Sequence, residues 1–336
     1  MRLDCSAPTR IDLAGGTIDI WPLYLFHDGA QTLNAAISLR AHVSLEDLAG
    51  ERVIVHSVDT GRSLEVAHWS ELSAHRELKL LARILHFFRA RGVRLTTRGE
   101  SPAGAGIAGS SALTVAVCAA LARWTETEYA AETLLQVAMN IEAQAIDVPT
   151  GLQDYRPAYY GGIAAIELRA DAPRRVPLDV DPQALAQRIV LAYTGEPRNS
   201  GTNNWEIYKR HIDGDPQVFD CFERIRDTAA AMREALARAD WHEVGRQIAR
   251  EWENRKQLAP GVTTPAIEAL IARACAAGAR AAKVCGAGGG GCLICYADPD
   301  RIPAVREALG AGGARLLDFR METEGLRFDD QHLTRL

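Results

Sequence analysis

The stretch Ser101–Leu113 reads Ser-Pro-Ala-Gly-Ala-Gly-Ile-Ala-Gly-Ser-Ser-Ala-Leu and joins a flexible loop to the start of a helix. Gly104, Gly106 and Gly109 allow the backbone to turn sharply and to approach a ligand closely. Residues 112–123 are almost all apolar and contain no helix breaker, so they predict a buried helix. Such a loop presents unpaired N–H groups and the positive end of the helix dipole at one place. The stretch therefore predicts an anion site of the kind that holds a nucleotide phosphate.

A second interpretation of this loop is purely structural. Ser110 or Ser111 can act as the N-cap of the helix, and the glycines then serve only a tight turn. No Lys follows Gly109, so the loop does not match the pattern Gly-x-x-x-x-Gly-Lys-Ser/Thr, and its spacing does not match a dinucleotide-binding fingerprint. Support for the phosphate interpretation has to come from other parts of the chain.

Composition narrows the class of protein further. The chain has 336 residues, enough for two domains of ordinary size, with 47% hydrophobic and 24% charged residues. Its net charge of −5 argues against nucleic acid or an anionic membrane as a main partner, and no apolar run reaches the roughly twenty residues of a membrane span. Seven cysteines indicate reduced thiols, and Met1–Pro8 lacks the apolar core of a signal peptide, so we expect a cytoplasmic protein.

Hydrophobic periodicity predicts two mixed halves, each with strands and helices, rather than a regular alternation of strand and helix. Strands are expected at 2–14, 32–46, 52–58, 93–98, 163–168, 189–195, 281–285 and 293–296, and helices at 77–91, 112–123, 130–146, 205–257 and 265–278. The segment 171–182 is rich in Pro, Asp and Arg. We expect it to separate an N-terminal domain of residues 1–170 from a C-terminal domain of residues 183–336.

Three motifs, in order along the chain, resemble those of the superfamily of galactokinase, homoserine kinase, mevalonate kinase and phosphomevalonate kinase (GHMP kinases). The first is Pro8–Gly15 (Pro-Thr-Arg-Ile-Asp-Leu-Ala-Gly), the second is Pro102–Ala112 and the third is Lys283–Gly291 (Lys-Val-Cys-Gly-Ala-Gly-Gly-Gly-Gly). The resemblance implies an α+β fold of two domains with ATP in the cleft between them. The N-terminal half would be similar to ribosomal protein S5 domain 2 and the C-terminal half would be ferredoxin-like.

In this resemblance the second motif wraps the triphosphate of ATP, and the third motif braces that loop and the substrate from the other half. The ATP-binding residues that it implies are Pro102, Gly104, Ala105, Gly106, Ile107, Gly109, Ser110 and Ser111.

The resemblance also implies the chemical roles of individual side chains. Asp154 matches the family's catalytic Asp, which orients or deprotonates the acceptor hydroxyl, and Arg10 would offset charge beside it. Ser110 or Ser111 together with Glu142 match the family's Mg²⁺ ligands, a hydroxyl and a carboxylate, and Mg²⁺ prefers such oxygen ligands. The structural alternatives are a helix cap for Asp154, a surface ion pair for Arg10, and an N–H or Arg partner for Glu142.

Substrate-binding residues are implied on the same grounds. Asp19 and Asn34 would bind substrate hydroxyls beside Asp154, and Gly288 and Gly289 would approach the substrate from the third motif. For Asp19 and Asn34 the alternative is the capping of a turn.

One branch of the superfamily is more similar than the others. Gly-Gly-Thr-Ile-Asp at 15–19, the segment 33–37 and Gln153-Asp154 resemble the D-glycero-D-manno-heptose 7-phosphate kinase branch. Tyr155 stands where that branch has a second Gln, so the acceptor subtype stays open. The alternatives are a kinase of a neutral or uronic sugar, a mevalonate-type kinase or decarboxylase, and a catalytically silent sensor of sugar and ATP.

A polar loop in the second half bears on the acceptor. The segment from Tyr193 to Trp205 carries Arg198 among short polar side chains, and a helix is expected to begin near Asn204. An Arg beside hydroxyls and a helix start suits a phosphate already on the substrate, and it suits a sugar carboxylate equally. We therefore expect an anionic sugar, such as a sugar phosphate, as the acceptor. The alternative is a solvated loop whose Asn caps the helix.

Overall fold

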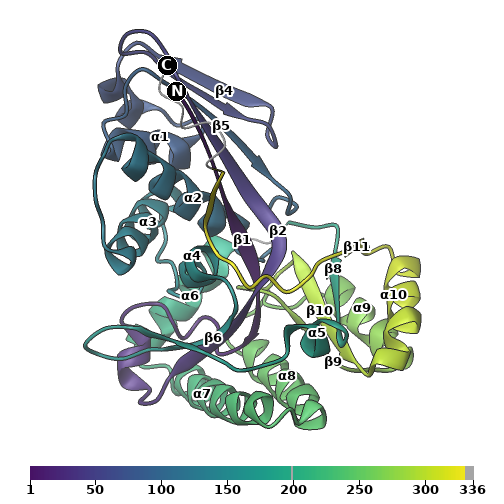
Figure 1. The fold of residues 1–336 in the computed structure, drawn as a ribbon. Helices are drawn as coiled ribbons and strands as arrows, with labels where there is room; N and C mark the ends of the chain where they lie inside the picture. The colour runs from purple at the N-terminus through teal and green to yellow at the C-terminus, as the bar shows by residue number, and fades with distance from the viewer. Residues whose placement is uncertain (198–199, 330–336) are drawn as a thin grey trace.

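The computed structural model describes residues 1–197 and 200–329, and it contains two β-sheets covered by helices (Figure 1). The larger sheet has eight strands in these ranges: β1 (Arg2–Ala14), β2 (Gln31–Asp47), β3 (Val53–Ser57), β4 (Arg62–Val66), β5 (Val93–Gly99), β6 (Ile163–Glu167), β7 (Arg174–Pro177) and β12 (Arg327–Asp329). The smaller sheet has the strand order β11 (Arg315–Leu317), β8 (Ile189–Tyr193), β10 (Cys292–Ala297) and β9 (Ala279–Val284).

Two long strands run the length of the larger sheet. β1 pairs antiparallel with β2 from Arg2 opposite Glu46 to Ala14 opposite Leu33. β2 has 17 residues, which at about 3.3 Å each span about 55 Å. One end of β2 pairs with β5 and the other end pairs with β6. The two strands therefore reach from the outer part of the N-terminal half down to the helices of the second half (Figure 1).

Helices cover the two sheets and connect them. Those within the described residues are α1 (Lys79–Phe87), α2 (Gly109–Trp124), α3 (Ala131–Ile146), α4 (Tyr155–Tyr160), α5 (Pro182–Ala186), α6 (Ser200–Ile212), α7 (Pro216–Ala237), α8 (Trp241–Arg255), α9 (Pro265–Ala276) and α10 (Ile302–Ala311), with 3-10 turns η1 (Leu23–Phe26), η2 (Trp69–Ala74) and η3 (Pro299–Arg301). No helix in these ranges is long and apolar enough to cross a membrane.

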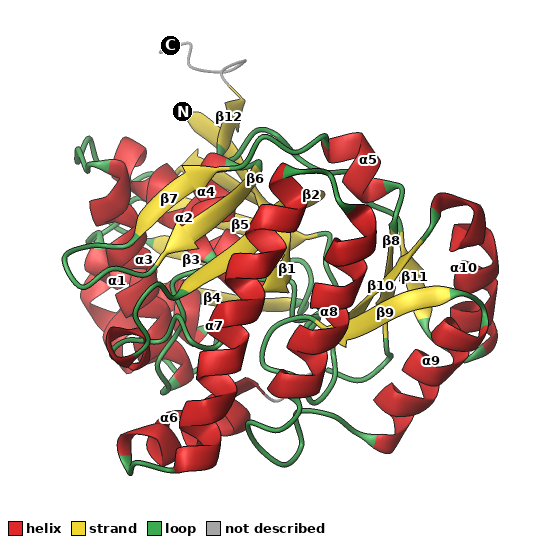
Figure 2. Ribbon diagram, turned by 90° about the horizontal axis from the view of Figure 1, so that it is seen from below, coloured by secondary structure: helices red, strands yellow, loops and turns green. Residues whose placement is uncertain are grey.

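The cores follow from where apolar faces meet. α2 is buried on nearly all sides, because Ala, Val, Cys and Leu occupy almost every position from 115 to 122, and it forms one core with α1, α3 and the larger sheet. A second core joins the inner ends of β1 and β2 to the smaller sheet, α7 and α8. Helices α7 and α8 lie side by side (Figure 2). The halves are thus joined by packed side chains as well as by the chain itself.

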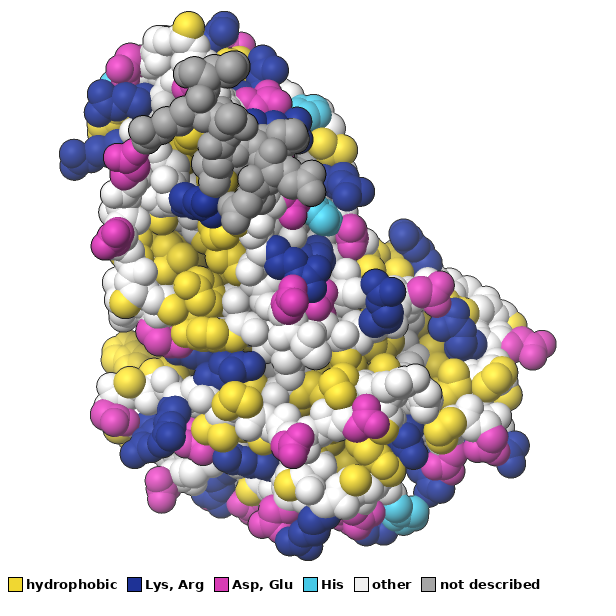
Figure 3. Space-filling model, viewed as in Figure 1, with side chains coloured by type: hydrophobic (Ala, Val, Ile, Leu, Met, Phe, Trp, Pro, Cys, Tyr) yellow, Lys and Arg dark blue, Asp and Glu magenta, His cyan; other side chains and the backbone are white. Residues whose placement is uncertain are grey.

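The expected α+β class is confirmed, and the structure contains two sheets. The expected linker 171–182 contains β7, which pairs with β6 in the larger sheet. β12, near the end of the chain, pairs with β1 and so returns to the first half. No disulfide joins any of the seven cysteines, all of which lie in the described ranges. On the face drawn in Figure 3, positive and negative side chains are intermixed over the surface.

Candidate active site

A cavity of about 430 Å³ lies where the inner end of β1, the glycine loop and the start of α2 meet the turn at 286–287. This volume falls within the roughly 300–1,000 Å³ of small-molecule sites. The predicted site residues that line it are Arg10, Asp19, Pro102, Gly104, Ala105, Gly106, Gly109, Ser110, Ser111, Glu142 and Asp154. Ile107 is buried beneath the loop, where its carbonyl accepts the N–H of Arg10 at 3.0 Å.

The glycine loop has the backbone conformation that its sequence predicts. Gly104 and Gly106 have φ values of 68° and 77°, a region that side chains rarely adopt. Ala108 is also left-handed (φ 62°), and no side chain caps α2 at its start. The first-turn N–H groups of α2 therefore face the cavity without a capping side chain, which leaves them for an anion. The alternative of a serine N-cap is thereby excluded.

The third motif supports this loop from the second half of the chain. Gly291 has φ 86°, and a Cβ there would lie 2.7 Å from the carbonyl oxygen of Ala105. The N–H of Cys292 donates to the same oxygen at 2.7 Å. Only a residue without a side chain at 291 lets the two loops approach this closely, so the bracing that the resemblance implied is physically explained.

Gly288 and Gly289 lie against Val262 and are not on the cavity wall. The N–H of Gly289 donates to the Val262 carbonyl at 2.8 Å, and a Cβ at Gly288 would lie 2.4 Å from that oxygen. The third motif contributes Gly286 and Ala287 to the wall instead. The motif predicted that this loop reaches the cavity. It did not predict which of the glycines line the wall, because that depends on the conformation of the turn.

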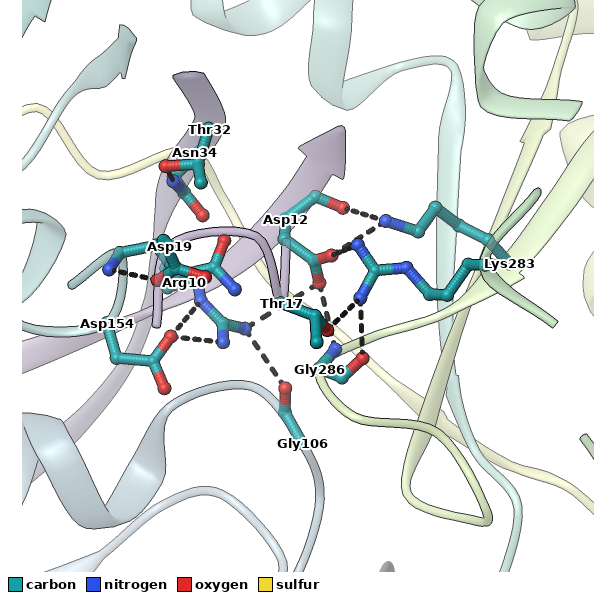
Figure 4. Close-up of polar contacts among 12 residues, drawn as sticks. Arg10, Asp12, Thr17, Asp19, Thr32, Asn34, Gly106, Asp154, Lys283 and Gly286 are labelled. Atoms are coloured by element: carbon teal, nitrogen blue, oxygen red, sulfur yellow. Dashed lines mark hydrogen bonds and ion pairs between the residues drawn. The ribbon is translucent and has the colours of Figure 1, made fainter. Parts of the chain in front are cut away.

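Arg10 and Asp154 form a directly hydrogen-bonded ion pair on the cavity wall (Figure 4). The Arg10 side chain is 1% exposed, and both its Nε and its Nη2 donate to Asp154 Oδ1, at 3.0 and 2.5 Å. Its Nη1 donates to the carbonyl of Gly106 at 3.0 Å. Asp154 precedes α4 but makes no capping bond with its side chain. Arg10 is buried rather than on the surface, so neither structural alternative for these two residues holds.

Oδ2 of Asp154 is the oxygen left over by this pairing. Both donors from Arg10 go to Oδ1, and the Asp154 side chain keeps 19% of its surface exposed on the cavity wall. Within the described residues no hydrogen bond to Oδ2 is formed. A carboxylate oxygen in this position is available to accept a proton or a hydroxyl hydrogen from a bound molecule.

Behind this pair lies a buried network of charges that the sequence did not reveal. Asp12, fully buried, receives Lys283 Nζ on Oδ2 at 2.7 Å and the N–H of Gly286 on Oδ1 at 3.0 Å. Arg255 Nη2 lies 3.6 Å from Asp12 Oδ2. Burial acts to raise the pKa of Asp12, but the cations of Lys283, Arg255 and Arg10 outweigh it and hold that pKa well below its usual range.

Glu251 completes the network from α8. Its Oε1 accepts Arg255 Nε at 2.7 Å, and its Oε2 lies 3.2 Å from Lys283 Nζ. The network ties β1 to α8 and β9, and thereby fixes Gly286 on the cavity wall. Arg10 and Asp12 alternate with apolar residues on one strand, and this pattern does not indicate that both are buried. Such alternation is typical of a solvated face, whereas here the second half of the chain covers that face.

Asp19 lies on the same wall and is 1% exposed. Its Oδ2 accepts the N–H of Gln153 at 2.8 Å, so Asp19 ties the turn after β1 to the residue before Asp154. Burial, followed by the nearby charge of Asp154, raises the pKa of Asp19 to about 6. A Cβ at Gly151 would lie 2.2 Å from this carboxylate, so glycine is required there.

Ser110 and Glu142 provide oxygen atoms suited to a hard cation. Ser110 Oγ donates to Glu142 Oε1 at 2.6 Å, and Glu142 is 4% exposed. Oε2 of Glu142 is buried and has no hydrogen-bond partner among the described residues. Burial raises the pKa of Glu142, against the opposing effect of the Ser110 hydrogen bond. An unsatisfied buried carboxylate oxygen beside a hydroxyl fits Mg²⁺, whose charge would compensate the burial.

Asn34, a third predicted substrate residue, does not line this cavity. Asn34 on β2 donates to Thr32 Oγ1 at 3.0 Å (Figure 4) and lines a separate small cavity beside Arg156 and Gly162. Arg198 lies outside the described residues. The helix that follows it, α6, reaches the large cavity through Asn204.

A glycine loop at a helix start whose N–H groups are left for an anion, a carboxylate held by an arginine, and a hydroxyl–carboxylate pair together fit a phosphotransferase. Comparison with known proteins agrees. The N-terminal domain profile of the GHMP kinases matches residues 74–162, and their C-terminal profile matches residues 232–315. The chain belongs to the GHMP kinase family, so it is a kinase that uses ATP and a small-molecule acceptor with an alcohol group.

Individual relatives span almost the whole chain. A D-glycero-alpha-D-manno-heptose 7-phosphate kinase of Campylobacter jejuni is 29% identical over 332 residues, which cover 95% of this chain and 96% of that protein. The crystal structure of a D-glycero-D-manno-heptose 1-phosphate kinase from Bacteroides thetaiotaomicron is similar with a TM-score of 0.80 and 24% identity, covering 98% and 99% of the two chains. A putative sugar kinase from Campylobacter jejuni gives 0.79 and 25%, with 98% of both chains covered.

Proposed function

We propose that this chain transfers the γ-phosphoryl group of ATP to a hydroxyl of a sugar phosphate, with D-glycero-D-manno-heptose 7-phosphate as the acceptor, in the cytoplasm and with Mg²⁺. The observation that carries the proposal is the Arg10–Asp154 pair, in which both donors go to Oδ1 and leave Oδ2 at the cavity. The named relative that acts on a heptose 7-phosphate supports the choice of acceptor.

Phosphoryl transfer needs three things from a protein: positioning, neutralisation of charge and an acceptor for the hydroxyl proton. In the proposed mechanism Asp154 Oδ2 orients the acceptor hydroxyl and takes its proton. Arg10 holds this carboxylate in place and offsets its negative charge, and its bond to the Gly106 carbonyl fixes the distance between the base and the glycine loop. The first-turn N–H groups of α2 would bind the phosphates of ATP.

Mg²⁺, when bound, neutralises negative charge on the phosphate oxygens. The residues that would hold it are Glu142, through the unsatisfied Oε2, and Ser110, through its hydroxyl. Ser111 lines the cavity beside them and is the alternative hydroxyl. Both serines belong to the first turn of α2, so the metal ligands and the phosphate-binding N–H groups come from one rigid element.

The charges on the cavity wall favour a hydroxyl-rich reacting end of the acceptor. Asp19 and Asp154 accept hydrogen bonds from hydroxyls, and Arg10 is the one Arg or Lys on the described part of the wall. Arg10 is already paired with Asp154. A carboxylate or phosphate placed beside Asp19 and Asp154 would therefore meet two negative charges and no unpaired Arg or Lys side chain on the described part of the wall. The phosphate of the acceptor would then lie farther from Asp154, toward the part of the wall that Asn204 lines.

A panel of acceptors tests this proposal. The purified chain is incubated with ATP, Mg²⁺ and, separately, D-glycero-D-manno-heptose 7-phosphate, galactose, L-fucose and mevalonate, and ADP release is measured. We expect turnover with the heptose phosphate, and ³¹P NMR of the product should show a second phosphate on the sugar. Preference for a neutral sugar or for mevalonate would contradict the proposed acceptor. Failure to bind ATP with Mg²⁺ at millimolar concentration would overturn the kinase mechanism itself.

A further inference from the structure

Thr17, in the turn that follows β1, has an unusual backbone conformation. Its φ is 75°, in the left-handed region that β-branched residues adopt only at a cost. It is 6% exposed, yet it lines the large cavity together with Asp19 and Arg10. Strained residues persist where the surrounding contacts fix them, and they gather at functional sites.

Arg255 on α8 holds the Thr17 side chain. Its Nη1 donates to Thr17 Oγ1 at 3.2 Å and to the Gly286 carbonyl at 3.0 Å. Its Nε donates to Glu251 at 2.7 Å, and Arg255 is 1% exposed. The guanidinium is planar and is held on several sides, so its direction toward Thr17 is fixed.

The chemistry of this contact determines the direction of the Thr17 hydroxyl. Arginine can only donate hydrogen bonds, so the Thr17 oxygen is the acceptor and its hydrogen is left for another partner. In residues 1–197 and 200–329 no group accepts that hydrogen. The nearby wall groups Asp19 and Asp154 are carboxyl groups, which accept hydrogen bonds when ionised. Thr17 thus adds an uncharged donor beside two carboxyl groups that accept hydrogen bonds.

We propose that Thr17 is a specificity-determining residue of the acceptor site, whose hydroxyl donates a hydrogen bond to an oxygen of a polyol acceptor, and that Arg255 is the positioning residue that aims it. This inference rests on the proposed function, and it deepens it by naming a contact that selects the acceptor. A sugar hydroxyl both donates and accepts, so it satisfies an ionised carboxylate and Thr17 at once. An acceptor that lacks an oxygen at this point leaves the Thr17 hydroxyl unpaired.

Thr17→Val tests the hydroxyl while keeping the β-branched shape, and with it the same backbone strain. With D-glycero-D-manno-heptose 7-phosphate, we expect the acceptor KM to rise about three- to tenfold, the effect of one neutral hydrogen bond. The KM for ATP should not change. Thr17→Ser keeps the hydroxyl and should restore the acceptor KM. Thr60→Val removes a hydroxyl elsewhere on the wall, in the turn between β3 and β4, and serves as the matched control.

The outcomes separate this inference from the proposed function. A wild-type chain inactive with the heptose phosphate would count against the proposed acceptor, whatever the variants do. An active wild type whose acceptor KM is unchanged in Thr17→Val, or rises equally in Thr60→Val, would overturn the role of Thr17 alone. A loss of activity in Thr17→Ser as large as in Thr17→Val would also contradict it.

A double-mutant cycle tests the positioning role of Arg255. Arg255→Lys keeps the charge beside Glu251 but cannot reach Thr17 and Gly286 together, so the acceptor KM should rise in the wild-type background. In the Thr17→Val background it should rise much less, because the hydroxyl that Arg255 aims is gone. Equal effects in both backgrounds would mean that Arg255 does not act through Thr17. Circular dichroism of each variant checks that the chain is folded.

Discussion

Asp19→Asn is a perturbation whose effect on stability can be worked out from the structure. The carboxylate is buried beside Asp154, and its pKa is raised from 3.8 to about 6. In the unfolded chain Asp19 ionises near pH 4, whereas in the folded chain it holds its proton until about pH 6. Rising pH therefore favours the unfolded state across this interval, and the wild type loses stability as the pH passes from about 4 to about 6.

The magnitude follows from the two pKa values. At about 1.4 kcal/mol for each pH unit, the interval from 3.8 to about 6 corresponds to about 3 kcal/mol at neutral pH. Asn is close to Asp in shape, and its side-chain oxygen can still accept the Gln153 N–H. Asn carries no charge, so Asp19→Asn should be more stable than the wild type at pH 7, while the two should be nearly equal near pH 4.

Urea unfolding of both proteins at several pH values measures this difference. We expect the unfolding free energy of Asp19→Asn minus that of the wild type to grow by about 2 to 3 kcal/mol between pH 4 and pH 7. The difference should be constant above about pH 7, and equal m-values would show that both unfold in the same way. A difference that does not vary with pH would refute the burial of an ionisable Asp19 beside Asp154. The KM of this variant for the sugar substrate should rise, because the charged carboxylate that accepts hydrogen bonds from sugar hydroxyls is lost.

Three further predictions concern other parts of the site. Glu142→Gln should raise the Mg²⁺ concentration needed for half-maximal activity about tenfold or more, through loss of a charge-assisted contact, and an unchanged metal titration would count against Glu142 as a ligand. Arg198→Ala should raise the acceptor KM roughly ten- to a hundredfold and leave the KM for ATP unchanged, and a neutral best substrate would contradict this. Lys283→Met should lower the unfolding free energy by about 3–5 kcal/mol, because the buried carboxylates of Asp12 and Glu251 lose the cation that pairs with both. A loss below about 1 kcal/mol in urea titration would show that stability does not depend on this network.

Local sequence predicted the parts of the fold that depend on local physics. The helix after the glycine loop was predicted because an unbroken apolar run leaves no alternative at that length, and α2 spans Gly109–Trp124. α4 was missed because six residues with Pro157 inside give no periodic signal. β12 was missed because a three-residue strand forms only through its pairing with β1.

The sequence predicted the site residues that the family resemblance covers, and it did not predict the contacts among other residues. The family resemblance implied that Arg10, Asp154 and Glu142 belong to one site, and all three line the same cavity. The contact of Asp12 with Lys283 joins residues 271 positions apart, and no local pattern pairs them. The orientation of Asn34 toward Thr32 depends on how β2 meets β6, which residue type does not reveal.

Asp154→Asn tests most directly the claim that Asp154 Oδ2 accepts the proton of the acceptor hydroxyl. The two measurements are kcat with saturating acceptor and the Kd for ATP with Mg²⁺. The substitution keeps the shape of the side chain and leaves an amide in place of the free oxygen. We predict that kcat falls by about 10²–10⁴, while the Kd for ATP stays within about twofold of the wild type. A variant with near-normal kcat would contradict the account, because Asp154 would then have no part in the chemistry.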